Sequence, residues 1–476
     1  MNDLNNQIPT STVDDIYAES GHWHVNTGEE KIHAKRMGGK WRNLKWWSNS
    51  FWLLFFLGPY LRWDDRQAVL FDIPNRQFHI FGATILPQDF WMLALLLLFF
   101  AILLAVVTAV AGRVWCGFFC FQTVWTDIYT WLEEKFEGGP QKRRKLDAAP
   151  WTFQKIKVKT QKHALWLLVA FLTGVSFVAW FQDSFTLWGE LVRFEAGMAS
   201  TVFIGMFIAG TYVLAGFLRE QACLWLCPYA RIQGVMIDKS TILPTYDFVR
   251  GEPRGRIKKN QKEEDRTTGD CVDCNQCVAV CPTGVDIRHG QQEGCITCAL
   301  CIDACDAVME KVGRPTGLIR YESLEGLETG HSVPLHKRGR VWVYSAILTF
   351  ALSGIVYGLS TLGAIDLKVL HDRQPLFVMQ SDGSIQNKYT LKVLNKLSDD
   401  VKIMVIAEGP EGLKMTGSED GFNARHGNVT PRTVFVRVPQ SSLTAESMPI
   451  KFTITTSKGT EVFSSSRESV FIGPAR

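Results

Sequence analysis

The chain has 476 residues, a length that predicts about three domains, and its formal net charge of +4 is too small to indicate binding to nucleic acid. Hydrophobic residues make up 46% of the chain and aromatic residues 12%, and they are concentrated in separate segments, which predicts a membrane part beside a polar part. All 12 cysteines belong to groups of regular spacing, a use that indicates metal or redox chemistry rather than packing.

Residues 1–43 form a polar segment without the apolar core of a cleavable signal peptide. His22 and His24, on either side of Trp23, are close enough in sequence to share a metal ion, although a solvated loop is the simpler interpretation. We expect this segment to lie in the cytosol, because of the distribution of lysine and arginine among the loops.

Five apolar stretches follow, each close to the ~20 residues that cross a bilayer as a helix. They cover residues 44–61, 90–111, 164–182, 200–218 and 341–363. The first stretch is the weakest, because Gly58 and Pro59 interrupt its end. The sequence thus predicts a membrane α-helical bundle of about five transmembrane helices, with four of them inside a region of residues 44–233.

The charges of the connecting loops predict how these helices are oriented. Lysine and arginine are frequent before the first stretch, between the second and third, and before the last, whereas the loop between the third and fourth carries only Arg193. Positive charges gather on the cytosolic side of a membrane. We therefore expect the amino terminus and residues 234–340 in the cytosol, and residues 364–476 on the opposite side.

Two cysteine pairs lie just past the cytosolic ends of the second and fourth stretches. Cys116 and Cys120 stand in GRVWCGFFCFQTVWTD, and Cys223 and Cys227 stand in REQACLWLCPYARIQGV. Each pair follows an arginine and precedes a glutamine, so the two halves form a weak internal repeat. Residues spaced i, i+4 share one face of a helix, so each pair is expected to present both sulfurs together.

Four thiols at one depth have several possible uses. They are able to bind a soft ion such as Cu(I), to cycle between dithiol and disulfide, or to ligate a further cluster. Free cysteines that serve only as small buried apolar residues are the alternative without function. We favour metal ligation, because the pattern repeats and because a helical pair roughly 5–6 Å apart at the β-carbons is poorly placed for an unstrained disulfide.

Residues 271–305 hold the other eight cysteines, spaced Cys-x2-Cys-x2-Cys-x3-Cys twice over. This is the bacterial ferredoxin pattern for two 4Fe-4S clusters, in which the fourth cysteine of each run ligates the cluster of the other run. The first cluster is therefore expected on Cys271, Cys274, Cys277 and Cys305. The second cluster is expected on Cys295, Cys298, Cys301 and Cys281.

Structural zinc and a disulfide scaffold are the competing interpretations of this stretch. Zinc sites usually combine two Cys-x2-Cys pairs across a longer spacer, which leaves the third cysteine of each run without a place. Disulfides require an oxidising compartment, whereas the loop charges favour the cytosol. We therefore expect residues 234–340 to form a cytosolic ferredoxin domain with two clusters, inserted before the last transmembrane helix.

Residues 364–476 have a different pattern. Segments such as YTLKVLNK, VKIMVIAE, TVFVRVP and IKFTITTS alternate apolar and polar residues between turn-forming residues, as the strands of an antiparallel β-sandwich do. The domain contains no cysteine, and a binding or docking role is expected for it. His371 and His426 are available as metal ligands, but isolated histidines are more often ordinary surface residues.

The order of these parts resembles one family over residues 60–476, that of the cytochrome c oxidase accessory protein CcoG, also called FixG. The resemblance is carried by RQAVLFDIPNRQFHIFG, GRVWCGFFC, QTVWTD, CPYARIQGVMID, GDCVDCNQCVAVCPTGVDIRHG, CITCALCIDACDAVMEKVG and GLIRYES. Membrane polyferredoxins such as the nitrate-reductase maturation protein NapH are similar at a greater distance, because they share the cysteine pairs and the cluster runs.

The resemblance implies a cupric reductase of the bacterial inner membrane that supplies Cu(I) for assembly of the cbb3-type oxidase, with an immunoglobulin-like C-terminal domain in the periplasm. Two positions depart from the family pattern. Phe121 stands where a proline is expected after Cys120, although Pro228 follows Cys227, so the equivalence of the two pairs is in question. Asp306 likewise replaces a proline after Cys305 and leaves the ligands unchanged.

The resulting hypothesis is one-electron reduction of Cu(II) at Cys116, Cys120, Cys223 and Cys227, with electrons relayed by the two clusters. The expected partners are the lipid bilayer, copper, an unidentified electron donor, and subunits or assembly factors of the cbb3-type oxidase, and a homodimer stays open. The sequence has no haem-binding Cys-x2-Cys-His, nicotinamide fingerprint or P-loop, so the donor must be another protein or a quinol. The alternatives are an electron-transfer subunit between quinone and a partner complex, and a non-enzymatic copper carrier.

Overall fold

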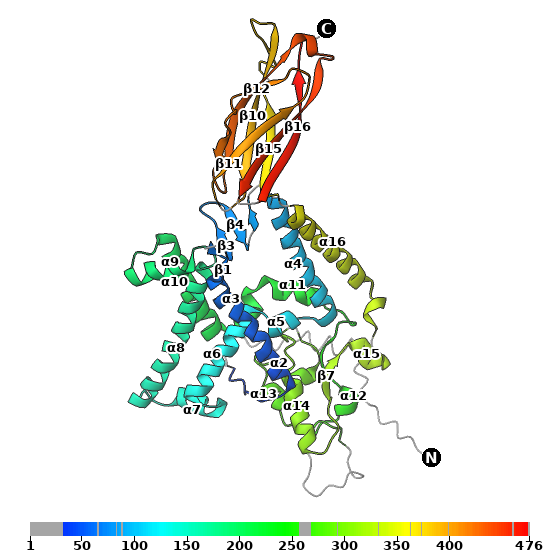
Figure 1. Ribbon diagram of the computed structural model, residues 1–476. Coiled ribbons are helices and arrows are strands. Elements are labelled where there is room, and N and C mark those ends of the chain that lie inside the picture. The colour runs from blue at the N-terminus through cyan, green and yellow to red at the C-terminus, as the bar shows by residue number, and fades with distance from the viewer. Residues whose placement is uncertain are drawn as a thin grey trace. The chain divides into compact units, whose positions relative to one another are not determined.

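The computed structural model describes residues 32–63, 66–81, 83–86, 89–256, 268–292, 294–331, 333–361, 363–372, 374–397, 399–458 and 461–474 (Figure 1). The two histidines of the amino-terminal segment, His22 and His24, lie outside these residues. The chain divides into two compact units. The first contains residues 1–59, 95–180 and 184–353, and the second contains residues 60–94, 181–183 and 354–476.

Four helices are long and apolar enough to cross a membrane. Two of them are whole helices, α8 (Phe153–Val178) and α16 (Gly339–Thr361). A third is Trp91–Ala111, which is nearly all of α4 (Phe90–Ala111). The fourth, Met198–Leu218, joins α10 (Met198–Val213) to the π-helical turn η4 (Leu214–Leu218). Large apolar side chains on their surfaces, such as Leu97 and Phe350, are 63% and 69% exposed, as lipid-facing residues are. The protein is a multi-pass membrane protein.

The first predicted stretch, residues 44–61, is not a fifth such helix. It is helical in four short pieces: α2 (Lys40–Asn49), η1 (Ser50–Trp52), α3 (Leu53–Leu57) and η2 (Gly58–Tyr60). Lys45, inside this stretch, points into the protein with 1% exposure. Among the described residues the long apolar helices therefore number four rather than five.

The internal repeat expected from the cysteine pairs is present as two similar helix–turn–helix segments. The first runs from α4 through α5 (Val114–Phe118) to α6 (Phe121–Glu137). The second runs from α10 through η4 and η5 (Ala222–Leu226) to α11 (Pro228–Met236). The remaining helices of this region are α7 (Pro140–Ala148) and α9 (Ser184–Arg193).

The cysteine-rich region is framed by one small antiparallel sheet. β6 (Leu243–Tyr246) pairs with β7 (Ile319–Glu322), which brings the two ends of the region together. Between and after them lie α12 (Phe248–Gly251), α13 (Gln276–Ala279), η7 (Ile287–His289), α14 (Leu300–Lys311), α15 (Leu324–Thr329) and η8 (Leu335–Lys337). Helix α2 abuts α14, because the amides of Trp41 and Arg42 donate to the Asp303 carboxylate at 3.1 and 2.8 Å.

The second unit contains the predicted β-sandwich. One sheet has the order β12–β14–β10–β8, with β9 beside β10, and the other has the order β13–β11–β15–β16. The bounds are β8 (Ile365–His371), β9 (Val378–Met379), β10 (Ser384–Asn395), β11 (Val401–Glu408), β12 (Lys414–Thr416), β13 (Phe422–Ala424), β14 (Val429–Pro439), β15 (Ser447–Lys458) and β16 (Glu461–Ile472).

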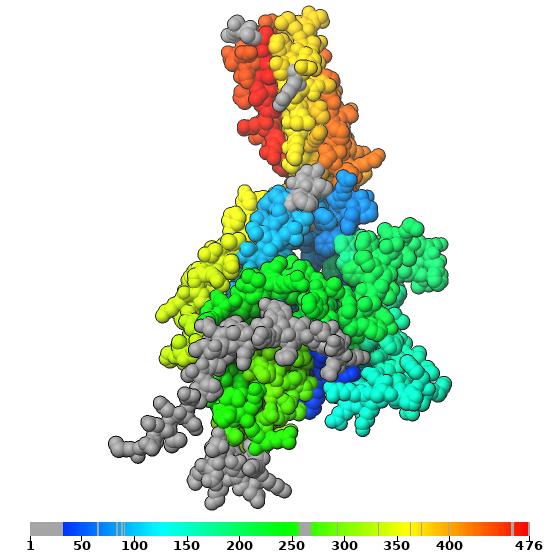
Figure 2. Space-filling model, turned by 180° about the vertical axis from the view of Figure 1, so that it is seen from behind, coloured from blue at the N-terminus to red at the C-terminus, as the bar shows by residue number. Residues whose placement is uncertain are grey.

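The sandwich core follows from strand alternation. Tyr389, Leu391 and Val393 occupy every second position of β10 and are fully buried between the sheets. The last strands of the domain, drawn red, lie beside its first strands, drawn yellow (Figure 2), and the Arg467 side chain of β16 donates to the Leu367 carbonyl of β8 at 3.2 Å. The predicted sandwich is confirmed.

Residues 60–94 belong to this second unit, although the sequence placed them among the transmembrane helices. They form the hairpin β1 (Arg62–Trp63) and β2 (Arg66–Gln67) and the sheet β3 (Val69–Asp72), β4 (Gln77–Ile80) and β5 (Ala83–Ile85). Lys396 of the sandwich pairs with Asp89 at 2.8 Å, and the Gln77 amide donates to the Gly427 carbonyl at 3.3 Å. These contacts attach the small sheet to the sandwich.

Candidate metal centres

The two ferredoxin-type cysteine runs have the same backbone conformation. In the first run Asp273 and Asn275, on either side of Cys274, have φ values of 51° and 56°. In the second run Thr297 and Ala299 flank Cys298 with φ values of 57° and 59°. Non-glycine residues rarely adopt this left-handed region, and alternating left- and right-handed residues turn successive amides toward one side, as in backbone nests around anions and Fe-S clusters.

Each run contributes to a separate cavity. The first cavity is lined by Cys271, Cys274, Cys277 and Cys305. The second is lined by Cys281, Cys295, Cys298 and Cys301, and Cys277 of the first set also contributes to its wall. Cys301 and Cys305 are one turn apart on α14, yet they reach different cavities, and Cys281 of the first run reaches the cavity of the second.

The residues around both cavities fit 4Fe-4S clusters. Each cavity is lined by the four cysteines of one predicted ligand set, and burial raises the pKa of Cys277, Cys295 and Cys305 to about 12, so these thiols ionise only when a metal replaces the proton. Arg288 lines the first cavity and pairs with Asp273 and Asp286 at 2.6 Å each, which fixes a positive charge beside the anionic cluster expected there.

The two membrane cysteine pairs share a local geometry that differs from one continuous helix. The amide of Cys120 donates to the Trp115 carbonyl at 2.9 Å, and the amide of Cys227 donates to the Ala222 carbonyl at 3.0 Å, each five residues back. Both second cysteines are extended and cap the next helix. Each pair therefore spans the end of one helix and the start of another, and Phe121 starts α6 as Pro228 starts α11.

Side chains of each half reach across to the other half. Gln122, after the first pair, donates to the Leu214 and Arg219 carbonyls at 2.8 and 3.1 Å. Gln233, after the second pair, accepts from the Cys116 thiol at 3.2 Å and donates to Thr108 at 3.3 Å. These reciprocal bonds hold the two pairs against each other.

The arginines that precede the pairs cross over in the same way. The Arg113 guanidinium donates to the Ala230 carbonyl of α11. The Arg219 guanidinium donates to the Glu133 carboxylate of α6 at 2.7 Å. Burial is the main cause that raises the pKa of Cys116 and Cys223 to about 12, and each of these two thiols is also influenced by Cys120 and Cys227. The four thiols are thus gathered into one region.

The four thiols are spread more widely than the ligands of a single ion. Across the residues that the structure describes, no three Cys, His, Asp or Glu side chains are grouped closely enough to hold one metal ion. The cysteines of the two ferredoxin cavities are likewise not grouped around a single ion, as expected for ligands of a four-iron cube. A single copper ion at the membrane thiols would therefore need some of them to move inward.

The first membrane pair contacts the loop of the second cavity directly. A Cβ added to Gly117 would lie 2.6 Å from the Ile296 carbonyl oxygen and 3.0 Å from Cys298 Cα, so only glycine allows this approach. The Arg113 amide donates to the Thr297 hydroxyl at 3.1 Å. Cys116 also packs against the apolar cluster that contains Cys298. The loop that carries Cys295 and Cys298 therefore touches the helix that carries Cys116.

Comparison with known proteins connects these parts. A family model described as a 4Fe-4S dicluster domain matches residues 218–324, one described as a 4Fe-4S binding domain matches residues 93–138, and one described as an IG-like fold at the C-terminus of FixG matches residues 355–474. The nitrogen fixation protein FixG of Rhizobium meliloti is 39% identical over 86% of this chain and 87% of its own length. The chain belongs to the FixG/RdxA family.

Two further relatives agree with this membership. Protein RdxA of Cereibacter sphaeroides is 40% identical over 80% of this chain and 83% of its own length. The ferredoxin-type protein NapH of Haemophilus influenzae is 25% identical over 56% of this chain and 85% of its own length, so the more distant likeness inferred from the cysteine motifs is present as well. The protein is thus a FixG-family membrane protein with 4Fe-4S binding domains.

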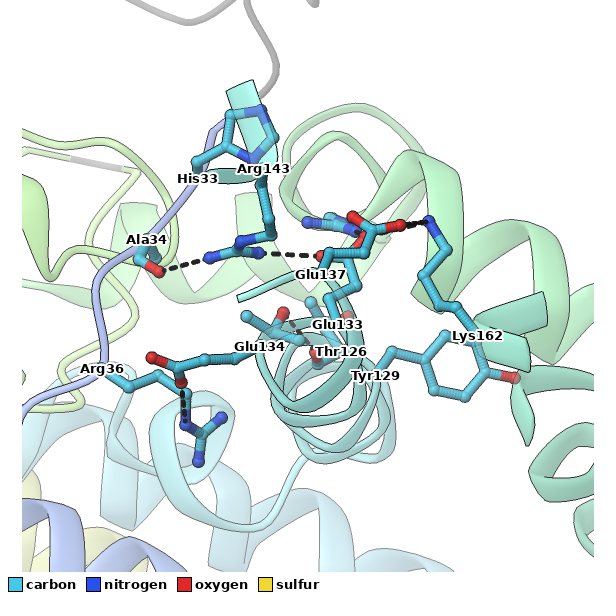
Figure 3. A network of polar contacts seen from close by, with 12 residues as sticks. His33, Ala34, Arg36, Thr126, Tyr129, Glu133, Glu134, Glu137, Arg143 and Lys162 are labelled. Carbon is cyan, nitrogen blue, oxygen red and sulfur yellow. Dashed lines mark hydrogen bonds and ion pairs between the residues drawn. The ribbon is translucent and has the colours of Figure 1, made fainter. Parts of the chain in front are cut away.

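In this FixG-family chain, helix α6 carries a buried ion-pair network that the sequence analysis missed (Figure 3). Glu133 accepts from Arg143 at 3.0 Å and from Arg219 at 2.7 Å, and Lys162 of α8 lies 2.9 Å from Glu137, one turn further along α6. The side chains of Glu133 and Arg143 are 1% and 0% exposed. The i, i+4 spacing of the two glutamates was visible in the sequence, but their cationic partners come from other parts of the chain: Arg143, Arg219, and Lys159 and Lys162 of α8.

Proposed function

We propose that this FixG-family protein reduces Cu(II) to Cu(I) at Cys116, Cys120, Cys223 and Cys227, and so supports assembly of the copper centre of a cbb3-type oxidase. Each copper ion takes up one electron, which an electron-donating protein or a quinol provides. Bound at their two cysteine sets, the 4Fe-4S clusters supply one-electron redox chemistry. Thiolates prefer Cu(I) to harder ions, so the four thiols favour the reduced product.

The observation that carries this proposal is the contact between Gly117 and the Ile296–Cys298 backbone. It joins the cluster loop to the membrane thiols without an intervening side chain, and the Arg113 bond to Thr297 holds the same surfaces together. Reductive chemistry at the thiols needs such a short link. A ferredoxin domain that exchanged electrons only with soluble partners would not require such close packing against the thiol-bearing helix.

The proposal places the ferredoxin domain and the thiols on the cytosolic side of the bacterial inner membrane and the β-sandwich in the periplasm. Its support is the concentration of lysine and arginine in the loops on one side, as in residues 142–162. Cysteine labelling with a membrane-impermeant reagent in intact cells and in inverted vesicles tests this orientation, with cysteine introduced at Glu411 of the sandwich.

The test of copper reduction uses the full chain, purified anaerobically with its clusters and reduced by dithionite that is then removed. Added Cu(II) should be converted to Cu(I), read with a Cu(I)-specific chelator, at up to one copper per cluster electron. Cys116→Ser and Cys223→Ser together should abolish the conversion while the iron content and the cluster EPR signal stay unchanged. Unaltered copper reduction in that variant would show that the membrane thiols are not the site.

A second candidate is that the four membrane thiols hold a further 4Fe-4S cluster in an electron-transfer subunit. It is favoured by the match of a 4Fe-4S binding domain to residues 93–138, which contain Cys116 and Cys120, and by the wide spacing of the thiols. Iron analysis separates the two candidates, since two clusters give about eight irons per chain and three give about twelve. Oxidation of the clusters by added quinone, without copper, would support the second candidate.

A further inference from the structure

A polar cavity lies beside Cys223 in the first unit. Its empty volume is about 630 Å³, part of which is open to solvent, and its walls include Cys223 on one side and Ile296 of the second cluster loop on another. It is therefore adjacent both to the proposed copper site and to the cluster loop.

Cationic side chains predominate in the lining of this cavity. Arg36, Arg42, Lys45 and Arg219 face two carboxylates, Asp127 and Glu220. Asp127 is bound by Arg36 and Arg42 at 2.9 and 3.0 Å. Although burial opposes ionisation, Lys45, Arg42 and Arg36 lower the pKa of Asp127 to about 2, so it is charged at neutral pH. Lys45, at 1% exposure, is buried against the cavity.

Three polar atoms in the cavity wall have no hydrogen-bond partner within the described part of the chain. They are Arg42 Nε, Thr123 Oγ1 and Glu220 Oε2, on residues that are 7%, 7% and 8% exposed. Leaving a buried polar atom unsatisfied is unfavourable, so such atoms mark the place of a ligand or water. Burial is the largest of the causes that raise the pKa of Glu220 above its ordinary value.

We propose that this cavity binds a small carboxylate anion, and that copper reaches Cys223 as an anionic carboxylate chelate rather than as the free aqua cation. This rests on the proposed copper reduction. The lining holds four cationic side chains against two carboxylates, and an anion is able to accept from the Arg42 and Thr123 donors, which a bare divalent cation is not. A ligand without hydrogen-bond acceptors would leave those donors unpaired.

Anion binding is tested directly by titration calorimetry on the full chain in detergent, with citrate as the probe and inorganic phosphate as the comparison. Citrate should bind to the wild-type protein, and Lys45→Gln should weaken it at least tenfold. Lys40→Gln on the same helix is the control, because Lys40 is exposed and is not part of the cavity wall. Thr123→Val removes an orphan hydroxyl without changing any charge, and it should weaken citrate even if Lys45→Gln fails to fold.

Tighter binding of phosphate than of citrate would overturn the carboxylate assignment, and binding of neither anion would overturn the site. The copper part is tested by reduction kinetics with anionic Cu(II)–nitrilotriacetate and the cationic Cu(II)–ethylenediamine complex. Lys45→Gln should raise KM at least tenfold for the anionic complex alone. If the wild-type protein reduces neither complex, copper reduction itself fails, while citrate binding still decides the cavity. If it reduces both and Lys45→Gln changes neither KM, the anionic route fails.

Discussion

Substituting Gly117 by alanine tests whether the membrane thiols and the cluster loop work through their close contact. The new methyl group would lie 2.6 Å from the Ile296 carbonyl oxygen and 3.0 Å from Cys298 Cα, and both are backbone atoms that cannot rotate away. Overpacking of this kind costs about 1–3 kcal/mol. Alanine also stabilises a helix by up to about 1 kcal/mol relative to glycine, so the net expectation is a loss of about 0–3 kcal/mol.

The matched control is Gly205→Ala in α10, where the added Cβ would have no neighbour within 4 Å. Only the helix-propensity gain remains there, so this variant should be as stable as the wild type or slightly more stable. The assays are denaturant unfolding, followed by the absorbance of the iron-sulfur clusters, and the rate of copper reduction. Gly117→Ala should slow copper reduction while keeping its iron content. If both variants unfold and react alike, the contact has no role in the link between loop and thiols.

Three further outcomes are expected. Glu133→Gln leaves Arg143 and Arg219 without their buried counter-charge and should cost about 3–5 kcal/mol of unfolding free energy, whereas Glu134→Gln, on a side chain 33% exposed, should cost about 1 kcal/mol or less. Because the pKa of Asp127 is lowered to about 2, its stabilisation is present above pH ~4 and lost as pH falls toward 2, and Asp127→Asn should remove that part of the acid dependence. Cys305→Ser should remove the cluster held with Cys271, and Cys301→Ser should remove the cluster held with Cys295. Mössbauer spectra of the two variants would show which cluster is missing. Loss of the same cluster in both variants would contradict the crossed arrangement.

The family membership and the mixed architecture were predictable from the sequence because their signals are local. The spacing of Cys271 to Cys305 needs only a few consecutive residues to bind a cluster, and the alternation along 384–395 places every second side chain on one face of a strand. Membrane helices need long apolar runs such as 91–111, because burying polar groups in lipid is costly. Each of these patterns is read from residues that are close together in the sequence.

The stretch at 44–61 shows the limit of prediction from local sequence. Its apolar length predicted a membrane helix, but Lys45 is buried and its charge lowers the pKa of Asp127, which comes from the distant helix α6. A partner that distant makes buried charge tolerable inside protein, and nothing in the stretch itself reveals it. The attachment of residues 60–94 to the sandwich depends in the same way on Gly427 and Lys396.

The sequence alone therefore determined which residues carry the chemistry, the twelve cysteines in repeated spacings. It also determined the parts of the fold: four strongly apolar helices and a β domain with alternating apolar and polar residues. Only the tertiary structure decided how that chemistry is connected. The approach of Gly117 to the loop of Cys298, the crossed bonds of Gln122 and Gln233, and the cationic cavity beside Cys223 all join residues from different elements. The physical reason is that spacing fixes what one element presents, whereas packing between elements fixes what it meets.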